Sequence, residues 1–155
     1  MNKIQQVKYL VVHCSATPPD LDWGVADIRR LHQDAFKWKD VGYHYIIKRD
    51  GTVEKGRADD TVGAHVKGYN EVALGICLVG GTNNKQEPEF NFTDQQMESL
   101  EKVVAKLLGT YPKAYVLGHR DFPAVTKACP CFDVKSWCEE NTISHNWPNT
   151  GLKFS

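Results

Sequence analysis

Two short segments of almost continuously apolar residues constrain the fold of this chain more than any other feature. They are Val7–Val12 (VKYLVV) and Ala73–Val79 (ALGICLV), and branched residues are frequent in both. A strand that is apolar on both sides of its backbone needs cover on both faces, as in a sheet that lies between helices. We therefore expect both segments to be buried strands.

Helical patterns alternate with these strands. Downstream of Gly24, apolar residues recur at intervals of three and four, as on one face of an amphipathic helix. A second helix is predicted to begin at the capping box Thr93–Gln96 and to end at Gly109, and Asp133 is the expected cap of a third (DVKSWCEEN). The apolar positions of the first helix are Val25, Ile28, Leu31, Ala35 and Phe36.

A hairpin and one more strand complete the predicted sheet. Tyr43–Lys48 and Val53–Lys55 flank Asp50-Gly51, a pair that supplies the positive φ of a tight turn, and Ala114–Leu117 is the last strand. The fold class that follows is mixed α/β, with a central mixed sheet of about five strands flanked by helices on both faces.

Composition limits the function classes. A chain of 155 residues suits one domain over 1–155, with its core at about 7–141 and an irregular tail at 142–155. Its 19 basic and 19 acidic residues cancel, so no overall charge attracts it to nucleic acid or an anionic membrane. No apolar run approaches the roughly 20 residues of a membrane helix, and the N-terminus lacks the pattern of a secretion signal. Five cysteines cannot all pair within one chain, which favours a reduced, cytosolic origin.

Three residues at predicted strand ends are candidate metal ligands. His13 follows the first strand, His119 follows the last one, and Cys129 lies in the loop before the final helix. Two imidazoles and a thiolate form a suitable catalytic zinc set, with the fourth position open. On spacing alone, histidines that are merely packed or solvated explain the pattern equally well. Tyr43 and Lys127 are candidate oxyanion donors beside such a metal, although a strand aromatic and a solvated loop charge are the more frequent roles for such residues.

Five motifs in one order decide between these interpretations. The chain resembles the type 2 N-acetylmuramoyl-L-alanine amidases from about Val7 to Trp137. The likeness is greatest to the small phage lysozymes that are amidases, with the animal peptidoglycan recognition proteins as wider relatives. The motifs are HCSAT (13–17), VGYHYIIKRDGTVEKGR (41–57), GAHVKGYN (63–70), GICLVGG (75–81) and KACPCFD (127–133).

The resemblance implies a role for each matching residue. One Zn²⁺ would be held by His13, His119 and Cys129, with Cys131 as the less favoured alternative to Cys129. Tyr43 and Lys127 map onto the catalytic tyrosine and lysine. The substrate-binding residues expected from the motifs are His65, Asn70 and Thr17.

The activity implied is zinc-dependent hydrolysis of peptidoglycan. The bond cut would be the amide between the lactyl group of N-acetylmuramic acid and L-alanine, with Tyr43 and Lys127 stabilising the oxyanion or Tyr43 relaying a proton. We expect a monomer with peptidoglycan as its partner, no nucleic acid and no membrane span; an inhibitory protein partner is not readable from these residues. Without a signal peptide, the protein would be made in the cytoplasm and act on the wall after release, as a phage or prophage endolysin or as a secreted toxin.

Three other functions compete with this one. A recognition module would bind peptidoglycan without cutting it, and the complete zinc set argues against that. A thiol hydrolase would use Cys129 or Cys131 with His119 and Asp121, and would be insensitive to chelators. A nucleobase deaminase needs a second cysteine after Pro130-Cys131, which this chain lacks.

The remaining histidines, cysteines and tryptophans are expected to be mainly structural. His32 is predicted at the edge of the first helix's apolar face, His44 in the sheet facing away from Tyr43 and Tyr45, and His145 in solvent. Cys14, Cys77 and Cys138 are expected to pack in the core. The tryptophans are candidates for stacking on sugar rings, two or more of them being core or edge residues instead: Trp23, Trp38, Trp137 and Trp147.

Overall fold

A computed structural model describes residues 2–123 and 125–143. It contains a five-stranded sheet of order β3-β2-β4-β1-β5, in which β1, β2, β4 and β5 run parallel and β3 is antiparallel to β2. The strands are β1 (Tyr9–Cys14), β2 (Tyr45–Ile47), β3 (Val53–Lys55), β4 (Ala73–Leu78) and β5 (Tyr115–Gly118). The helices are α1 (Val25–Phe36), α2 (Asp94–Thr110) and α3 (Val134–Glu140), with short 3₁₀ turns η1 (Asn70–Val72) and η2 (His119–Asp121).

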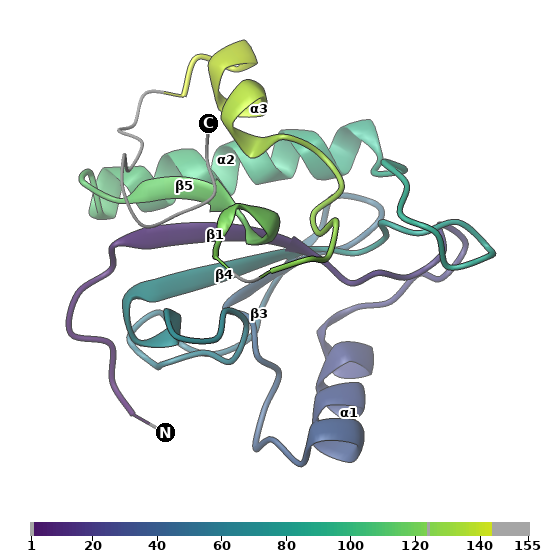
Figure 1. The fold of residues 1–155 in the computed structure, drawn as a ribbon, viewed down its shortest axis with the longest axis horizontal. Helices are drawn as coiled ribbons and strands as arrows, with labels where there is room; N and C mark the ends of the chain where they lie inside the picture. The colour runs from purple at the N-terminus through teal and green to yellow at the C-terminus, as the bar shows by residue number, and fades with distance from the viewer. Residues whose placement is uncertain (1, 124, 144–155) are drawn as a thin grey trace.

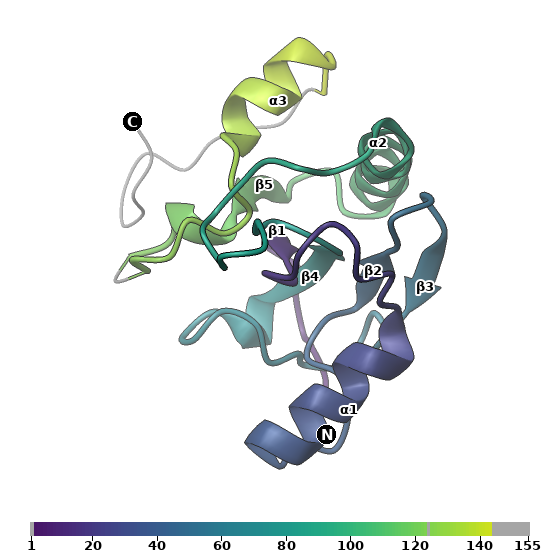
Figure 2. The same cartoon turned by 90° about the vertical axis from the view of Figure 1, so that its right-hand side faces the viewer.

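The helices cover both faces of the sheet. Figures 1 and 2 show α2 and α3 on one side and α1 on the other. Alternate residues of β4 divide in the same way: Leu74, Ile76 and Leu78 pack with α2 and α3, whereas Cys77 packs with Ile28 of α1. The structure therefore confirms the mixed α/β class with helices on both faces.

Most local signals correspond to what the structure shows. Gly51 has a φ of 90° in the β2–β3 turn, as the hairpin pattern predicts. Thr93 and Gln96 form the reciprocal capping box of α2, and the Asp133 side chain accepts a hydrogen bond from the backbone of Lys135 at the start of α3. Among the described residues, no helix combines the length and apolarity needed to cross a bilayer.

Several predicted boundaries are wrong, among them that of the first hairpin strand, which covers Tyr45–Ile47 and not Tyr43–Lys48. The first strand extends to Cys14, because β4 continues to pair with it as far as Leu78. His13 therefore lies inside β1, not after it. Gly109 does not end α2, which continues one residue further to Thr110.

The apolar pattern of α1 also has a different meaning from the one predicted. Only Ile28 and His32 of this helix are buried, whereas Leu31 and Phe36 are 42% and 52% exposed. His32 is thus a core residue, and not one at the edge of the apolar face: its Nδ1 accepts a hydrogen bond from the backbone N–H of Gly42 at 2.8 Å. His145, Trp147 and most of the predicted tail lie outside the described residues.

Candidate active site and metal centre

His13 lies near the carboxyl end of β1, on the face of the sheet that α1 covers. It pairs in register with Cys77 of β4 and is 1% exposed. Carboxyl ends of parallel strands are where α/β proteins commonly place reactive groups. Figure 2 looks onto this end of the sheet.

His119 and Cys129 reach the same place from the segment after β5. The η2 turn begins at His119 and is capped by Asp121, whose Oδ2 accepts from the backbone N–H of Gly118 at 2.8 Å. The backbone N–H of Arg120 donates to the Cys129 carbonyl at 2.8 Å, which closes the loop between the two candidate ligands. The ligand atoms of His13, His119 and Cys129 all lie within 4.8 Å of one another, and this is the only such group found among the described residues.

The chemistry of this group fits a zinc ion. Burial, together with neighbouring His65 and His119, lowers the pKa of His13 well below its usual value. The imidazole is therefore neutral, and one of its nitrogens has a lone pair available to bind a metal ion. The backbone N–H of Cys14 donates to Cys129 Sγ at 3.1 Å, which holds the sulfur beside the two histidines. Two neutral imidazoles and one thiolate with an open fourth side are the ligands of a catalytic zinc site.

His65 packs directly against His13. The two side chains are joined by a hydrogen bond of 2.9 Å between His13 Nε2 and His65 Nδ1. His65 lies flat over Gly75 of β4, where any Cβ would come within 2.8 Å of its ring. Burial lowers the pKa of His65 to about 3, so it too is neutral. Its predicted contact with substrate stays a prediction, while its contact with His13 is a finding that sequence reasoning missed.

Asn70 holds the segment that carries His65. Its Oδ1 accepts from the backbone N–H groups of His65 and Val66, each at 2.8 Å. Asn70 also lines the site cavity, so the structure leaves its predicted substrate contact open. Thr17 is not among the cavity-lining residues: it is buried, and its hydroxyl is hydrogen-bonded to that of Ser15 at 2.6 Å.

Tyr43 stands beside the candidate metal ligands. Its ring centroid is 5.1 Å from that of His13 and 6.4 Å from that of His65. Burial, helped by the nearby thiols of Cys77 and Cys129, holds the pKa of Tyr43 well above its usual value, so the phenol keeps its proton. Tyr43 precedes β2 and packs on the α1 side of the sheet, whereas Tyr45 packs on the α2 side. The prediction that the two tyrosines share a face is therefore wrong, because Tyr43 is not in the strand.

The three candidate ligands line a cavity of about 560 Å³, together with Tyr43, His65 and Asn70. Lys127, as predicted from the sequence, is one of its lining residues, and Lys67 is another. Among the described residues, no aspartate or glutamate lines this cavity. The cavity is therefore suited to a ligand that carries negative charge.

The other cysteines lie outside the candidate ligand group. All five are free thiols. Cys131 Sγ donates to the carbonyl of Gly81 at 3.3 Å, while Cys14, Cys77 and Cys138 are buried, as expected. His44 is also buried and structural: its Nε2 lies 2.7 Å from the Thr61 carbonyl.

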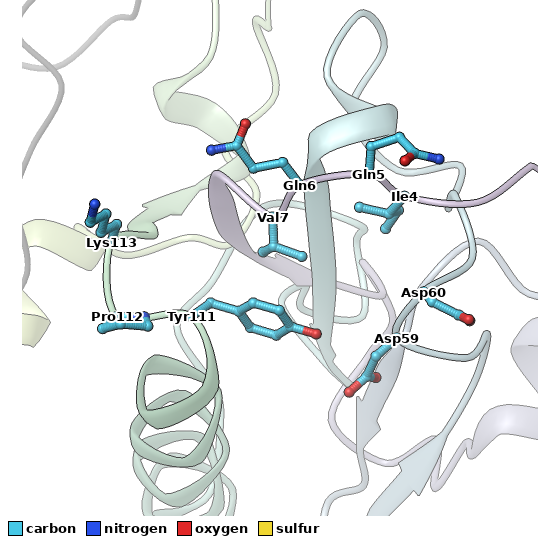
Figure 3. A pocket seen from close by; sticks show the side chains of 9 residues that line it. All are labelled: Ile4, Gln5, Gln6, Val7, Asp59, Asp60, Tyr111, Pro112 and Lys113. Atoms are coloured by element: carbon cyan, nitrogen blue, oxygen red, sulfur yellow. The ribbon is translucent and has the colours of Figure 1, made fainter.

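A second cavity, of about 350 Å³, lies at the opposite end of the sheet (Figure 3). Its walls include Val7, just before β1, together with Tyr111 and the carboxylates of Asp59 and Asp60. Both carboxylates already have partners. Asp59 binds the hydroxyl of Tyr45 and the ammonium of Lys55, and Asp60 binds Lys3 at 3.2 Å. This cavity contains none of the predicted site residues.

The comparison with known proteins agrees with this geometry. Residues 3–132 match the family model described as N-acetylmuramoyl-L-alanine amidase. The chain belongs to this amidase family. It is 53% identical over 141 residues to the endolysin of Enterobacteria phage K11, with 91% of each chain covered. It is 48% identical over 134 residues to the endolysin of Escherichia phage T7, covering 86% of this chain and 87% of that one.

Solved amidase structures share the fold. The amidase LysC from Clostridium intestinale URNW superposes with a TM-score of 0.75 at 26% identity, covering 90% of this chain and 87% of that one. Together these findings confirm the expected activity class, an N-acetylmuramoyl-L-alanine amidase, in preference to a thiol hydrolase or a nucleobase deaminase. The roles of the individual residues in this amidase are proposals, developed next.

Proposed function

We propose that this amidase is a zinc-dependent endolysin that cuts the lactyl–L-alanine amide of peptidoglycan. The observation that carries the proposal is the convergence of His13, His119 and Cys129 beside the protonated Tyr43, within one cavity. The endolysin role is supported by 53% identity to a phage endolysin over 91% of its length. We propose that the chain acts as a monomeric catalytic domain that is made in the cytoplasm and reaches the wall on release.

The protein's own residues prepare the metal position. His13 Nε2 and His65 Nδ1 are hydrogen-bonded at 2.9 Å, and in the His13 tautomer with its proton on Nε2, Nδ1 is the free lone pair that would hold the metal. His65 is held in turn by Gly75 beneath its ring and by the backbone contacts of Asn70. Zinc in such a site supplies Lewis-acid activation of water and of the scissile carbonyl.

Tyr43 and Lys127 act on the substrate. The phenol of Tyr43 keeps its proton at neutral pH and donates it as a hydrogen bond to the developing oxyanion. Lys127 lines the same cavity and adds a positive charge toward that oxygen. Together with Lys67, it also favours the binding of a stem peptide that carries carboxylates.

Digestion of purified peptidoglycan tests the proposal. The zinc-loaded protein is expected to release new N-terminal alanine, to lose this activity with a chelator and to regain it with zinc. New reducing sugar ends in place of alanine would contradict the amidase assignment. Peptidoglycan binding with neither product would indicate a recognition module, and loss of activity on alkylation but not on chelation would indicate a thiol hydrolase.

A further inference from the structure

Three cysteine thiols meet at the carboxyl end of β1, and only that of Cys129 belongs to the candidate ligand group. The thiol of Cys14 is hydrogen-bonded to the thiols of both Cys129 and Cys131. Cys14 is the last residue of β1, whereas Cys129 and Cys131 lie in the loop before α3. Cys14 and Cys131 are therefore adjacent thiols from distant parts of the chain, and the chemistry described above uses neither of them.

Contacts with Gly81 bring the same two sulfur atoms together. Cys131 Sγ donates to the carbonyl oxygen of Gly81 at 3.3 Å. A Cβ at Gly81 would lie 2.7 Å from Cys14 Sγ, so Cys14 packs directly on this glycine as well. Because Gly81 has no side chain, both sulfur atoms can lie against it.

The backbone of Cys131 is held in a conformation that is unfavourable for a residue with a side chain. Its φ is 74°, in the left-handed region. Hydrogen bonds hold the loop on each side: the backbone N–H of Cys131 donates to the carbonyl of Ala128 at 2.6 Å, and that of Arg120 donates to the carbonyl of Cys129. A strained residue that the surrounding structure maintains in this way often has a function.

We propose that Cys14 and Cys131 are a disulfide-forming pair that cross-links β1 to the loop before α3 under oxidising conditions. Two thiols in hydrogen-bonding contact need only small side-chain rotations to reach bonding distance. Cys129 is not consumed by this bond, so the candidate ligand group stays complete.

The reaction is a thiol–disulfide exchange, with a small disulfide such as glutathione disulfide as the oxidant. Cys131 is partly exposed, so its sulfur attacks the oxidant first and releases one glutathione thiol. The buried sulfur of Cys14 then attacks Cys131 Sγ and displaces the second glutathione. In total, the two cysteines lose two electrons and two protons, and one glutathione disulfide becomes two glutathione thiols. Because Cys14 is only 6% exposed, the exchange is expected to be slow.

The cross-link holds together two segments of the active site. It joins the loop that carries Cys129 to the strand that carries His13. Because the bond closes a loop that spans most of the chain, it restricts the unfolded protein far more than the folded one. Only the biological setting rests on the proposed function: an endolysin made among reduced thiols would meet oxidising conditions after its release.

Peptide mapping tests the pairing. The reduced protein is incubated with glutathione disulfide in the presence of zinc, alkylated and digested with trypsin. We expect two of the five thiols to be lost and the peptides that contain Cys14 and Cys131 to be joined. Fragmentation of the joined peptides is needed, since Cys129 and Cys131 lie in one tryptic peptide, ACPCFDVK. A bond that includes Cys129, glutathione left on Cys131 without a cross-link, or retention of all five thiols would overturn the proposal.

Cys131→Ser and Cys138→Ser are a matched pair of variants. Each replaces one sulfur atom with oxygen, but Cys138 belongs to α3. Cys138→Ser is expected to lose two thiols on oxidation, as the wild type does, whereas Cys131→Ser is expected to form no cross-link. Equal loss of thiols in the two variants would show that Cys131 is not the partner.

Urea unfolding measures the effect of the bond. The oxidised wild type is expected to unfold at a urea concentration about 1 M higher than the reduced one, and dithiothreitol is expected to abolish the shift. Cys131→Ser should have the same midpoint before and after oxidation. An oxidised wild type with an unchanged or lower midpoint would overturn the cross-linking role. A protein that forms the bond but cleaves no peptidoglycan, even when reduced, would keep the pairing and overturn the proposed function instead.

Discussion

The imidazole of His13 is surrounded by three other rings, those of Tyr43, His65 and His119. Burial among them keeps His13 neutral, and its Nε2 is hydrogen-bonded to Nδ1 of His65 at 2.9 Å. At the scale of single residues, the proposed zinc site thus rests on an imidazole pair, in which His13 would hold the metal and His65 would orient it.

At this scale, Tyr43→Phe tests the oxyanion role. The change removes one hydroxyl and keeps the ring that packs against His13. We expect zinc content and unfolding temperature to stay as in the wild type, while kcat on peptidoglycan falls about 100-fold or more.

Tyr115→Phe serves as the control for this substitution, because Tyr115 lies at the start of β5, at the other end of the sheet. It is expected to keep wild-type turnover. Wild-type turnover in Tyr43→Phe would refute the assigned role.

At the scale of elements, α2 is joined to the sheet by one buried amide. The Nε2 of Gln96 donates to the carbonyls of Ile47 and Val79, at 3.1 and 2.8 Å, and its Oε1 accepts from Thr93 and Arg49. Gln96 therefore satisfies backbone groups at the ends of β2 and β4 while it also completes the cap of its own helix. Sequence identified the cap, but the contacts with the two strands depend on how α2 lies over the sheet.

Gln96→Ala is expected to destabilise the protein by about 2 kcal/mol or more, because it removes a fully buried side chain that makes four hydrogen bonds. Gln95→Ala is the matched control, since Gln95 is the exposed neighbour in the same turn and the change in helix propensity is identical. Urea unfolding measures both. A loss of the same size in the two variants would show that the buried amide contributes little.

At the scale of the whole molecule, the candidate ligands come from distant segments. His13 belongs to β1, His119 to the η2 turn after β5, and Cys129 to the loop before α3. A metal that joins these segments binds the folded chain and not the unfolded one. Zinc is therefore expected to stabilise the whole domain by mass action.

Free zinc at about 100 times its dissociation constant is expected to raise the free energy of unfolding by about 2.7 kcal/mol. Cys129→Ser should lose most of this increase, whereas Cys131→Ser should keep it, because Cys131 Sγ instead donates to the carbonyl of Gly81. Unfolding with zinc and with a chelator measures the difference. The reverse pattern in the two variants would identify Cys131 as the ligand.

The sequence by itself determined the elements of this protein, because they depend on neighbours in the chain. The apolar runs of β1 and β4, the turn at Gly51 and the cap at Thr93 are local patterns, and motif resemblance named His13, His119, Cys129, Tyr43 and Lys127.

Only the tertiary structure decided which residues meet. The pairing of His65 with His13 requires the bare surface of Gly75 on a neighbouring strand, and no spacing in the chain reveals it. The exposure of Leu31 and Phe36 is decided in the same way, since the pattern of α1 shows an apolar stripe but not what it faces. Parallel strands bring together residues far apart in sequence, and the site depends on those contacts.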